Sequence, residues 1–408
     1  MHFRTCAVTA LTLFTALGTA SAAGLKDCVA KAEANSPAVK AYEQKLAAAL
    51  AARERDRRAG LPKLSASAED GYSSYSTDSG LANGFNGTLS LQLGWDLPKV
   101  LSGYQRLAVL ETDKSRLLLE ISRRALSRNI QKNYYRLYIL AEKKADYAEA
   151  KAYFVSHIAA IEDLGDRGMD VQLDLLHANM QLRSLGVAAA GTESALKNEL
   201  LALNSGTGGN FGESDFDFRD IPAPAEAAIP AGTAEAAPET RLNSLDLRSA
   251  EESYRQSGYF YAPALAFGVN KAVTPIDPAA ERSRVFLSLS LDLFDFGSRA
   301  ADRKSLLAES EARRASGLED LRVLKLTLLQ LQTAIRNAAS ACAAAGAGLQ
   351  DADKAMKTAD EYYRQGKIKE TDLLSVFSDY LAAKEQARDA LGDYLDKKAD
   401  LDYAVEAI

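Results

Sequence analysis

The sequence contains two copies of one pattern, about 200 residues apart. Gly168 precedes the residues Asp-Leu-Leu at 174–176 by six positions. Gly366 precedes a second Asp-Leu-Leu at 372–374 by the same six positions. An alternating apolar run that ends in Leu97 recurs 196 residues further on. This repetition indicates a tandem duplication of a large unit, which is typical of quasi-symmetric structural proteins.

The first 22 residues predict a secretory signal peptide. Arg4 precedes a short apolar stretch over 7–17, and the small residues at 20–22 form a cleavage site. That stretch is too short to cross a bilayer as a helix, and no other approaches 18 uninterrupted apolar residues. Removal of the signal leaves Cys28 and Cys342, too few for a disulfide scaffold. We therefore expect an exported chain without a helical membrane anchor.

Alternating side chains predict two strands in each repeat. The clearer segments are 87–97 and 283–294, where every second residue is apolar. Weaker partner strands are expected over 63–75 and 264–271, with a polar turn over 76–86. The apolar faces are formed by Leu89, Leu91, Leu93 and Trp95 in the first repeat, and by Val285, Leu287, Leu289 and Leu291 in the second.

Strands with one apolar and one polar face have two explanations. They can form a small soluble sheet packed on a core, or the wall of an outer-membrane barrel whose outward residues meet lipid. Four strands cannot close a barrel, and lipid does not tolerate an open sheet edge. The second explanation therefore requires several chains that each contribute four strands. Trp95 either faces the barrel exterior near the membrane interface or packs within an ordinary sheet.

Long helices complete each repeat. Residues 100–167 lack proline, and residues 298–365 carry a heptad pattern typical of a coiled coil. At 1.5 Å per residue, each region could extend about 100 Å. The two rows of the heptad seam are Leu328, Ile335, Cys342, Leu349, Met356 and Tyr363, and Leu324, Leu331, Ala338, Ala345, Ala352 and Ala359. Opening and returning helices are expected over 25–59, 169–204, 243–258 and 367–403.

These elements predict two structural repeats, over 23–204 and 243–408. The segment between them, 205–242, is rich in Gly, Pro and Ala and is expected to be an irregular linker.

No catalytic or metal-binding motif is recognisable. Besides His2 in the signal peptide, the chain has His157 and His177, both on helical segments without Cys, Asp or Glu at metal-ligand spacing. We therefore expect both at polar positions on helix faces. Phosphate-binding glycine loops, nucleophile elbows and credible triads are also missing from the sequence. The net charge of −6 argues against a nucleic-acid partner. We expect no enzyme, no cofactor and no metal.

The duplicated strand–strand–long helix order, the Gly-x5-Asp-Leu-Leu motif and the Leu-Phe-Asp-Phe-Gly stretch at 293–297 resemble the outer-membrane efflux proteins, the TolC-like channels. The resemblance covers nearly the whole mature chain. It implies an α+β membrane protein that forms a homotrimer. Twelve strands would form a β-barrel in the outer membrane, continued by a periplasmic α-helical tunnel.

The resemblance also implies a function. Such a chain would be a passive exit duct of a tripartite efflux or type I secretion system. A periplasmic adaptor (membrane fusion) protein, coupled to an inner-membrane pump of the RND or ABC type, would open it. The alternative from another class is a soluble periplasmic coiled-coil scaffold or adhesin. Matched apolar rows in both repeats favour the duct.

The resemblance assigns roles to the helix turns. Gly168 and Gly366 would be the periplasmic tips, turn positions that suit glycine. Asp372 falls where the family can place a constricting carboxylate, and Asp174 is its repeat partner. Tyr363 matches a position that in some members latches the inner helix pair. Both aspartates can also be acids placed at a helix start, where the helix dipole favours them.

Two tip positions depart from the family pattern. Ile368 occupies the place of a latch arginine, and Ser375 that of a second carboxylate. The implied adaptor contact comprises the tip turns, 165–171 and 365–371, and the neighbouring Leu175, Leu176, Leu373 and Leu374.

Overall fold

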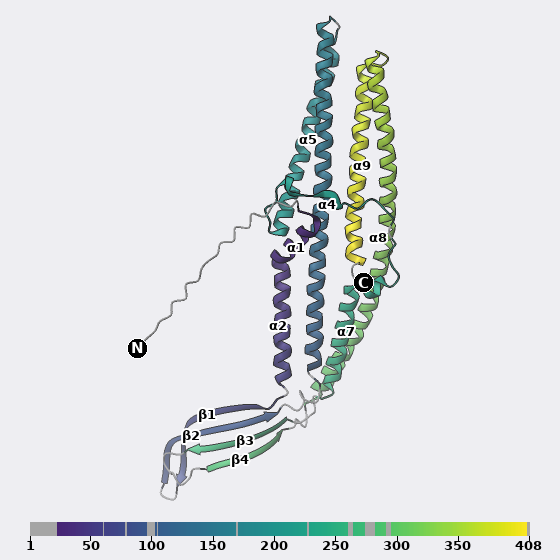
Figure 1. Cartoon of the computed structure of the whole chain (residues 1–408). Helices are drawn as coiled ribbons and strands as arrows, with labels where there is room; N and C mark the ends of the chain where they lie inside the picture. The colour runs from purple at the N-terminus through teal and green to yellow at the C-terminus, as the bar shows by residue number, and fades with distance from the viewer. Residues whose placement is uncertain are drawn as a thin grey trace, which may run out of the picture. The chain divides into compact units, whose positions relative to one another are not determined.

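The computed structural model is built from long helices and one four-stranded sheet (Figure 1). It describes residues 23–59, 61–77, 80–95, 103, 105–168, 170–226, 228–259, 264–273, 282–290 and 295–405. The helices are α1 (Leu25–Asn35), α2 (Pro37–Ala59), α4 (Gln105–Asp166), α5 (Gln172–Thr207), α6 (Thr233–Ala236), α7 (Pro238–Ser257), α8 (Ser298–Arg364) and α9 (Glu370–Val405). Long helices combined with four strands confirm the predicted fold class.

The opening helix is divided, contrary to the prediction of one helix over 25–59. Ser36 separates α1 from α2 and has ψ 120°. Pro37 causes this break, because a proline ring disfavours helical geometry in the residue before it. Proline suits the first position of a helix, where no backbone donor is needed, and α7 likewise begins at Pro238.

The four strands pair antiparallel in the order β1-β2-β3-β4. They span Lys63–Thr77, Gly80–Trp95, Ala264–Val273 and Arg282–Ser290. The predicted turn over 76–86 is wrong, because β1 and β2 pair up to Thr77 and Gly80. The added part of the hairpin is polar. Backbone hydrogen bonds between the two strands hold it together, and these bonds do not require alternating apolar side chains. The predicted strand ends at 96–97 and 291–294 lie outside the described residues.

The chain divides into two compact units, each containing parts of both sequence repeats. One unit comprises Met1–Ser36, Asn129–Ala225 and Ala338–Asp396, and the other comprises Pro37–Arg128, Glu226–Asn337 and Lys397–Ile408. We call them the tip unit and the sheet unit, because the first contains both tip turns and the second contains all four strands.

Four helices share the core of the tip unit. Its buried residues are Tyr147, Ala150 and Phe154 of α4, Leu185 of α5, Met356 and Ala359 of α8, and Leu373, Leu374 and Phe377 of α9. The predicted seam of α8 is confirmed, since every residue of its two rows is buried or half-buried.

Ion pairs join α4 to α9 along the tip unit. Lys143 Nζ lies 2.6 Å from Asp389 Oδ1, and Arg388 Nε lies 2.9 Å from Asp146 Oδ2. Residue numbers rise on one helix as they fall on the other, so the two helices run antiparallel. The apolar core provides most of the stability, because burial of apolar surface is the dominant favourable contribution to folding.

Candidate functional site

Both predicted tip turns contain glycine in the left-handed conformation. Gly168 has φ +90° and Gly366 has φ +69°. After α8, the Gly366 amide donates to the Tyr363 carbonyl and the Lys367 amide to the Tyr362 carbonyl, each at 2.8 Å. These two bonds form a Schellman motif, which ends a helix by satisfying its last carbonyl groups. Glycine is therefore required at the turn for a local physical reason.

The two predicted gate aspartates lie in the first turn of their helices. Asp372 is the third residue of α9, and its Oδ2 accepts a 3.3 Å hydrogen bond from the Lys369 amide. Asp174 is the third residue of α5. Both positions suit an acid at a helix start, and the Asp372 side chain is exposed.

A buried pair between His157 and Glu370 lies beneath the tip turns. His157 Nε2 is 2.8 Å from Glu370 Oε1 and 2.9 Å from Oε2. The side chains are 7% and 1% exposed. The prediction that His157 occupies a polar helix face is therefore wrong. The pair joins α4 to the first residue of α9, across 213 positions in sequence.

Aromatic rings surround this pair. The Tyr153 ring is stacked on His157, with centroids 5.8 Å apart and planes 8° apart. The Tyr363 ring lies 5.3 Å from His157. Burial, followed by the charge of Glu370 and a hydrogen bond to it, raises the pKa of Tyr363. The charge of Asp174 acts in the same direction, so residues of α4, α5, α8 and α9 meet at one place.

The two Asp-Leu-Leu motifs differ in exposure. Leu373 is 1% exposed and Leu374 is buried, and both belong to the core of the tip unit. Leu176 is 57% exposed, and Leu175 is half-buried. The second motif thus serves packing, and only the first offers a large apolar side chain to a partner.

The predicted apolar face continues across the sheet. Leu64, Leu93, Phe267 and Leu287 lie opposite one another in successive strands. The next row contains Ala66, Leu91, Val269 and Val285. Residues directly opposite in antiparallel strands share a face. Of the predicted face residues, Leu89, Leu91, Val285, Leu287 and Leu289 are exposed and Leu93 is half-buried.

An apolar face of this extent needs a partner or a lipid environment, since soluble monomers rarely expose one. For Trp95 the structure gives only the backbone position in β2, and Leu291 lies outside the described residues.

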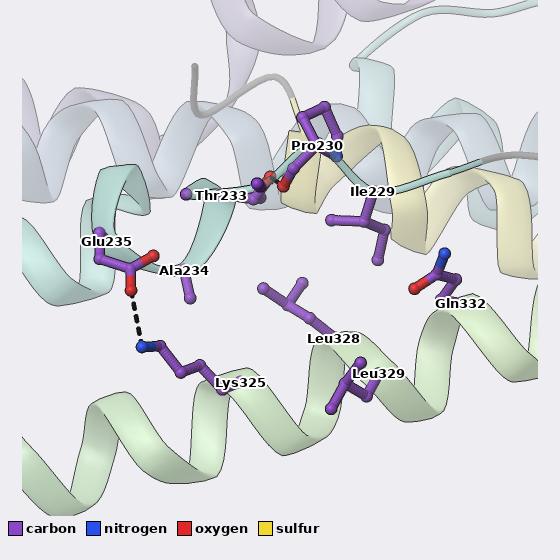
Figure 2. A pocket seen from close by; sticks show the side chains of 11 residues that line it. Ile229, Pro230, Thr233, Ala234, Glu235, Lys325, Leu328, Leu329 and Gln332 are labelled. Carbon is purple, nitrogen blue, oxygen red and sulfur yellow. Dashed lines mark hydrogen bonds and ion pairs between the residues drawn. The ribbon is translucent and has the colours of Figure 1, made fainter.

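A cavity of about 330 Å³ lies between residues 229–235 and α8 in the sheet unit (Figure 2). Leu328, Leu329 and Ile229 contribute apolar walls. At one edge, Lys325 Nζ lies 2.6 Å from Glu235 Oε1. Its lining residues include neither histidine nor cysteine. The cavity is therefore a gap in the packing between the linker segment and α8.

Within the described ranges, no helix combines the length and apolar character needed to cross a membrane. The same residues contain no group of three His, Cys, Asp or Glu side chains placed to hold a metal ion.

Known proteins share both the sequence pattern and the fold. Residues 28–209 match the family model described as outer membrane efflux protein. A search of curated proteins gave no match. A membrane protein from Pseudomonas aeruginosa superimposes with a TM-score of 0.81 at 16% identity, covering 93% of each chain.

Two further solved structures are similar. The CmeC outer membrane channel of Campylobacter jejuni has a TM-score of 0.75 at 17% identity, covering 94% of this chain and 85% of that one. The open-state MtrE outer membrane channel of Neisseria gonorrhoeae has a TM-score of 0.78 at 14% identity, covering 93% and 88%. The expected outer-membrane location with a periplasmic extension agrees with these matches. Residues 28–209 thus resemble the outer membrane efflux proteins in sequence, and the chain shares the fold of these solved structures over nearly its whole length.

Proposed function

We propose that this chain forms a passive exit duct in the outer membrane, as a homotrimer whose twelve strands close one barrel. The exposed apolar face of the sheet carries the proposal. Two of its rows are apolar across all four strands, so lipid can cover them. A duct of this kind binds no cofactor and catalyses no reaction.

The two edge strands of the sheet explain why several chains are needed. β1 and β4 are each paired on one side only, in a sheet with the order β1-β2-β3-β4. An unpaired edge in lipid leaves backbone donors and acceptors without partners. If β4 of one chain pairs with β1 of the next, three chains satisfy every edge.

The returning helix α5 offers a surface for a neighbouring chain. Its large exposed apolar residues are Leu173, Leu176, Met180, Val187 and Leu201. Most of their spacings are three, four or seven positions or a multiple of seven, which places them along one helix face. In the trimer this face would pack against the next protomer and complete a helical tunnel wall.

The tip residues would form the gate. In the trimer, three copies of the exposed Asp372 would surround the exit axis, with Asp174 and Tyr363 behind them. Three like charges close to one axis would favour cations over anions. An adaptor would bind the tip turns, 165–171 and 365–371, and open the gate, with energy supplied by an inner-membrane pump.

Planar bilayer recording tests the duct directly. Purified mature protein is expected to give discrete single-channel currents that prefer cations. Protein that leaves the bilayer unperturbed, and that is recovered in a detergent-free soluble fraction, would contradict the proposal. That result would favour a periplasmic coiled-coil scaffold.

A further inference from the structure

We propose that the ends of α2, α4, α7 and α8 next to the sheet form a basic belt that binds anionic phospholipid headgroups. The belt consists of Arg53, Arg55, Arg57, Arg58, Arg106, Arg248, Arg255, Arg299, Arg303 and Lys304. The inference rests on the proposed function, because it requires the sheet to lie in a bilayer. It adds a lipid class and a binding surface.

The belt concentrates positive charge in an acidic chain. The four helix ends, residues 53–59, 105–110, 248–257 and 298–304, carry ten basic and five acidic residues. The whole chain has 49 basic and 55 acidic residues. Nine of the ten basic side chains are exposed, and Arg299 is half-buried. The charge is thus available to a ligand outside the protein.

Contacts within the sheet unit bring the four helix ends together. Gln105 Nε2 of α4 donates to the Arg57 carbonyl of α2 at 3.4 Å. The Arg303 guanidinium of α8 lies 5.3 Å from the Tyr254 ring of α7. A cavity lined by Arg106, Val109, Leu110, Arg248, Glu251, Glu252 and Arg255 connects α4 to α7. The belt is therefore one surface.

The ion pairs of the belt do not remove its positive charge. Arg57 and Arg58 share the single carboxylate of Glu54, while Arg55 pairs with Asp56, Arg255 with Glu252 and Arg299 with Asp295. The Arg57 and Arg58 side chains are 75% and 71% exposed, and ion pairs at exposed positions are weak. A phosphate group can compete for such arginines because guanidinium groups bind phosphate with two parallel hydrogen bonds.

The position of the belt identifies its ligand. Between three and nine residues separate each helix end from its strand. The four strands lie beyond these helix ends (Figure 1). The apolar side chains of the sheet are exposed. Long basic side chains at such a boundary keep their charge at headgroup level. Anionic headgroups attract clusters of this kind. We therefore assign the belt to the membrane leaflet nearer the helices.

Lipid retention by the full-length mature protein tests the assignment. The belt variant carries Arg57→Gln, Arg106→Gln and Arg248→Gln. The matched control removes three exposed arginines outside the belt, through Arg183→Gln, Arg322→Gln and Arg336→Gln. Each protein is reconstituted in phosphatidylethanolamine vesicles with and without phosphatidylglycerol, then re-extracted in mild detergent. Retained lipid is measured by mass spectrometry.

Wild-type and control proteins are expected to retain phosphatidylglycerol in preference to phosphatidylethanolamine. In the belt variant, the ratio of retained phosphatidylglycerol to phosphatidylethanolamine should be about tenfold lower. Equal preference in all three inserted proteins would overturn the belt and leave the duct intact. Failure of every protein to enter vesicles of either composition would contradict the duct itself. Displacement of the lipid by millimolar inorganic phosphate would overturn the lipid assignment, because the belt would then be a free-anion site.

Discussion

His157 and Glu370 form a buried, two-oxygen contact that fixes the start of α9 against α4, with Nε2–Oε distances of 2.8 and 2.9 Å. The contact lies directly after the turn at Gly366, so it determines where the second tip can be relative to α4. Tyr363 reaches the same carboxylate from the end of α8. Any outward movement of this turn has to keep or replace these bonds.

Removing one partner of the pair should loosen the tip. Glu370→Ala or His157→Ala removes one side of this buried hydrogen-bonded pair, and an unsatisfied buried polar group costs about 1–3 kcal/mol. Hydrogen exchange of amides 370–377 should therefore become faster. The double variant His157→Phe with Glu370→Leu should recover much of the protection, since an apolar pair removes both polar groups. Equal protection in both single variants and wild type would show that the pair does not hold the tip.

The left-handed glycine at the second tip should resist substitution. Gly366→Ala forces a side chain into φ +69° and should destabilise the turn by about 1–2 kcal/mol. Gly348→Ala is the matched control, because a Cβ there meets no atom within 4 Å and helical alanine is favoured by about 1 kcal/mol. Thermal melting by circular dichroism should shift in opposite directions for the two variants. A shift in the same direction would contradict the assigned turn geometry.

The carboxylate of Asp372 should determine ion preference. In planar bilayers, Asp372→Ala should raise single-channel conductance or weaken cation preference, because it removes three like charges from the gate. Asp351→Ala is the control, since Asp351 is an exposed acid of α8 paired with Lys354. If the Asp372 variant matches wild type in both properties, the acidic constriction has to be abandoned.

Adjacent residues of β4 should tolerate charge very differently. Leu287→Arg places a charge on the proposed lipid face and should destabilise the assembled barrel by about 2–4 kcal/mol near the bilayer midplane. Ser288→Arg places the same charge on the opposite face and should be tolerated. Heat-dependent migration of the assembled protein in gels compares the two. Equal loss of assembly in both variants would contradict a lipid-facing row.

The two free cysteines should react slowly in the folded protein. Burial is the main cause that raises the pKa of Cys28 from 9.0 to about 11, and burial also raises the pKa of Cys342. Because the folded state keeps the Cys28 proton while the unfolded state releases it, this group should lower stability as the pH rises from about 9 to 11. Iodoacetamide labelling at pH 8 should modify half-buried Cys342 before Cys28. Rapid labelling of Cys28 without denaturant would contradict its burial.

Local patterns in the sequence predicted most of the fold. The heptad pattern of α8 and the alternating pattern of β2 and β4 can be read from residues close together in the sequence. The structure confirms the helix and the strands that they predict. The break at Ser36 was also accessible, since Pro37 marks it. The full length of β2 could not be predicted, because backbone hydrogen bonds pair its first residues with β1 and leave no alternating apolar pattern in the sequence.

The tip cluster needed information that local patterns do not contain. His157 and Glu370 are 213 positions apart, so no local sequence pattern links them. One signal was available, because Tyr147, Ala150, Phe154, His157 and Ile161 follow the apolar spacing of one helix face. That spacing places His157 in the core but cannot identify its partner.

The oligomeric mass of the mature protein, extracted from outer membranes in detergent, tests the central claim most directly. Light scattering corrected for bound detergent should give three chains per particle, since four strands per chain then close a twelve-stranded barrel. A monomer that is soluble without detergent would leave both sheet edges open, and it would contradict the exit duct.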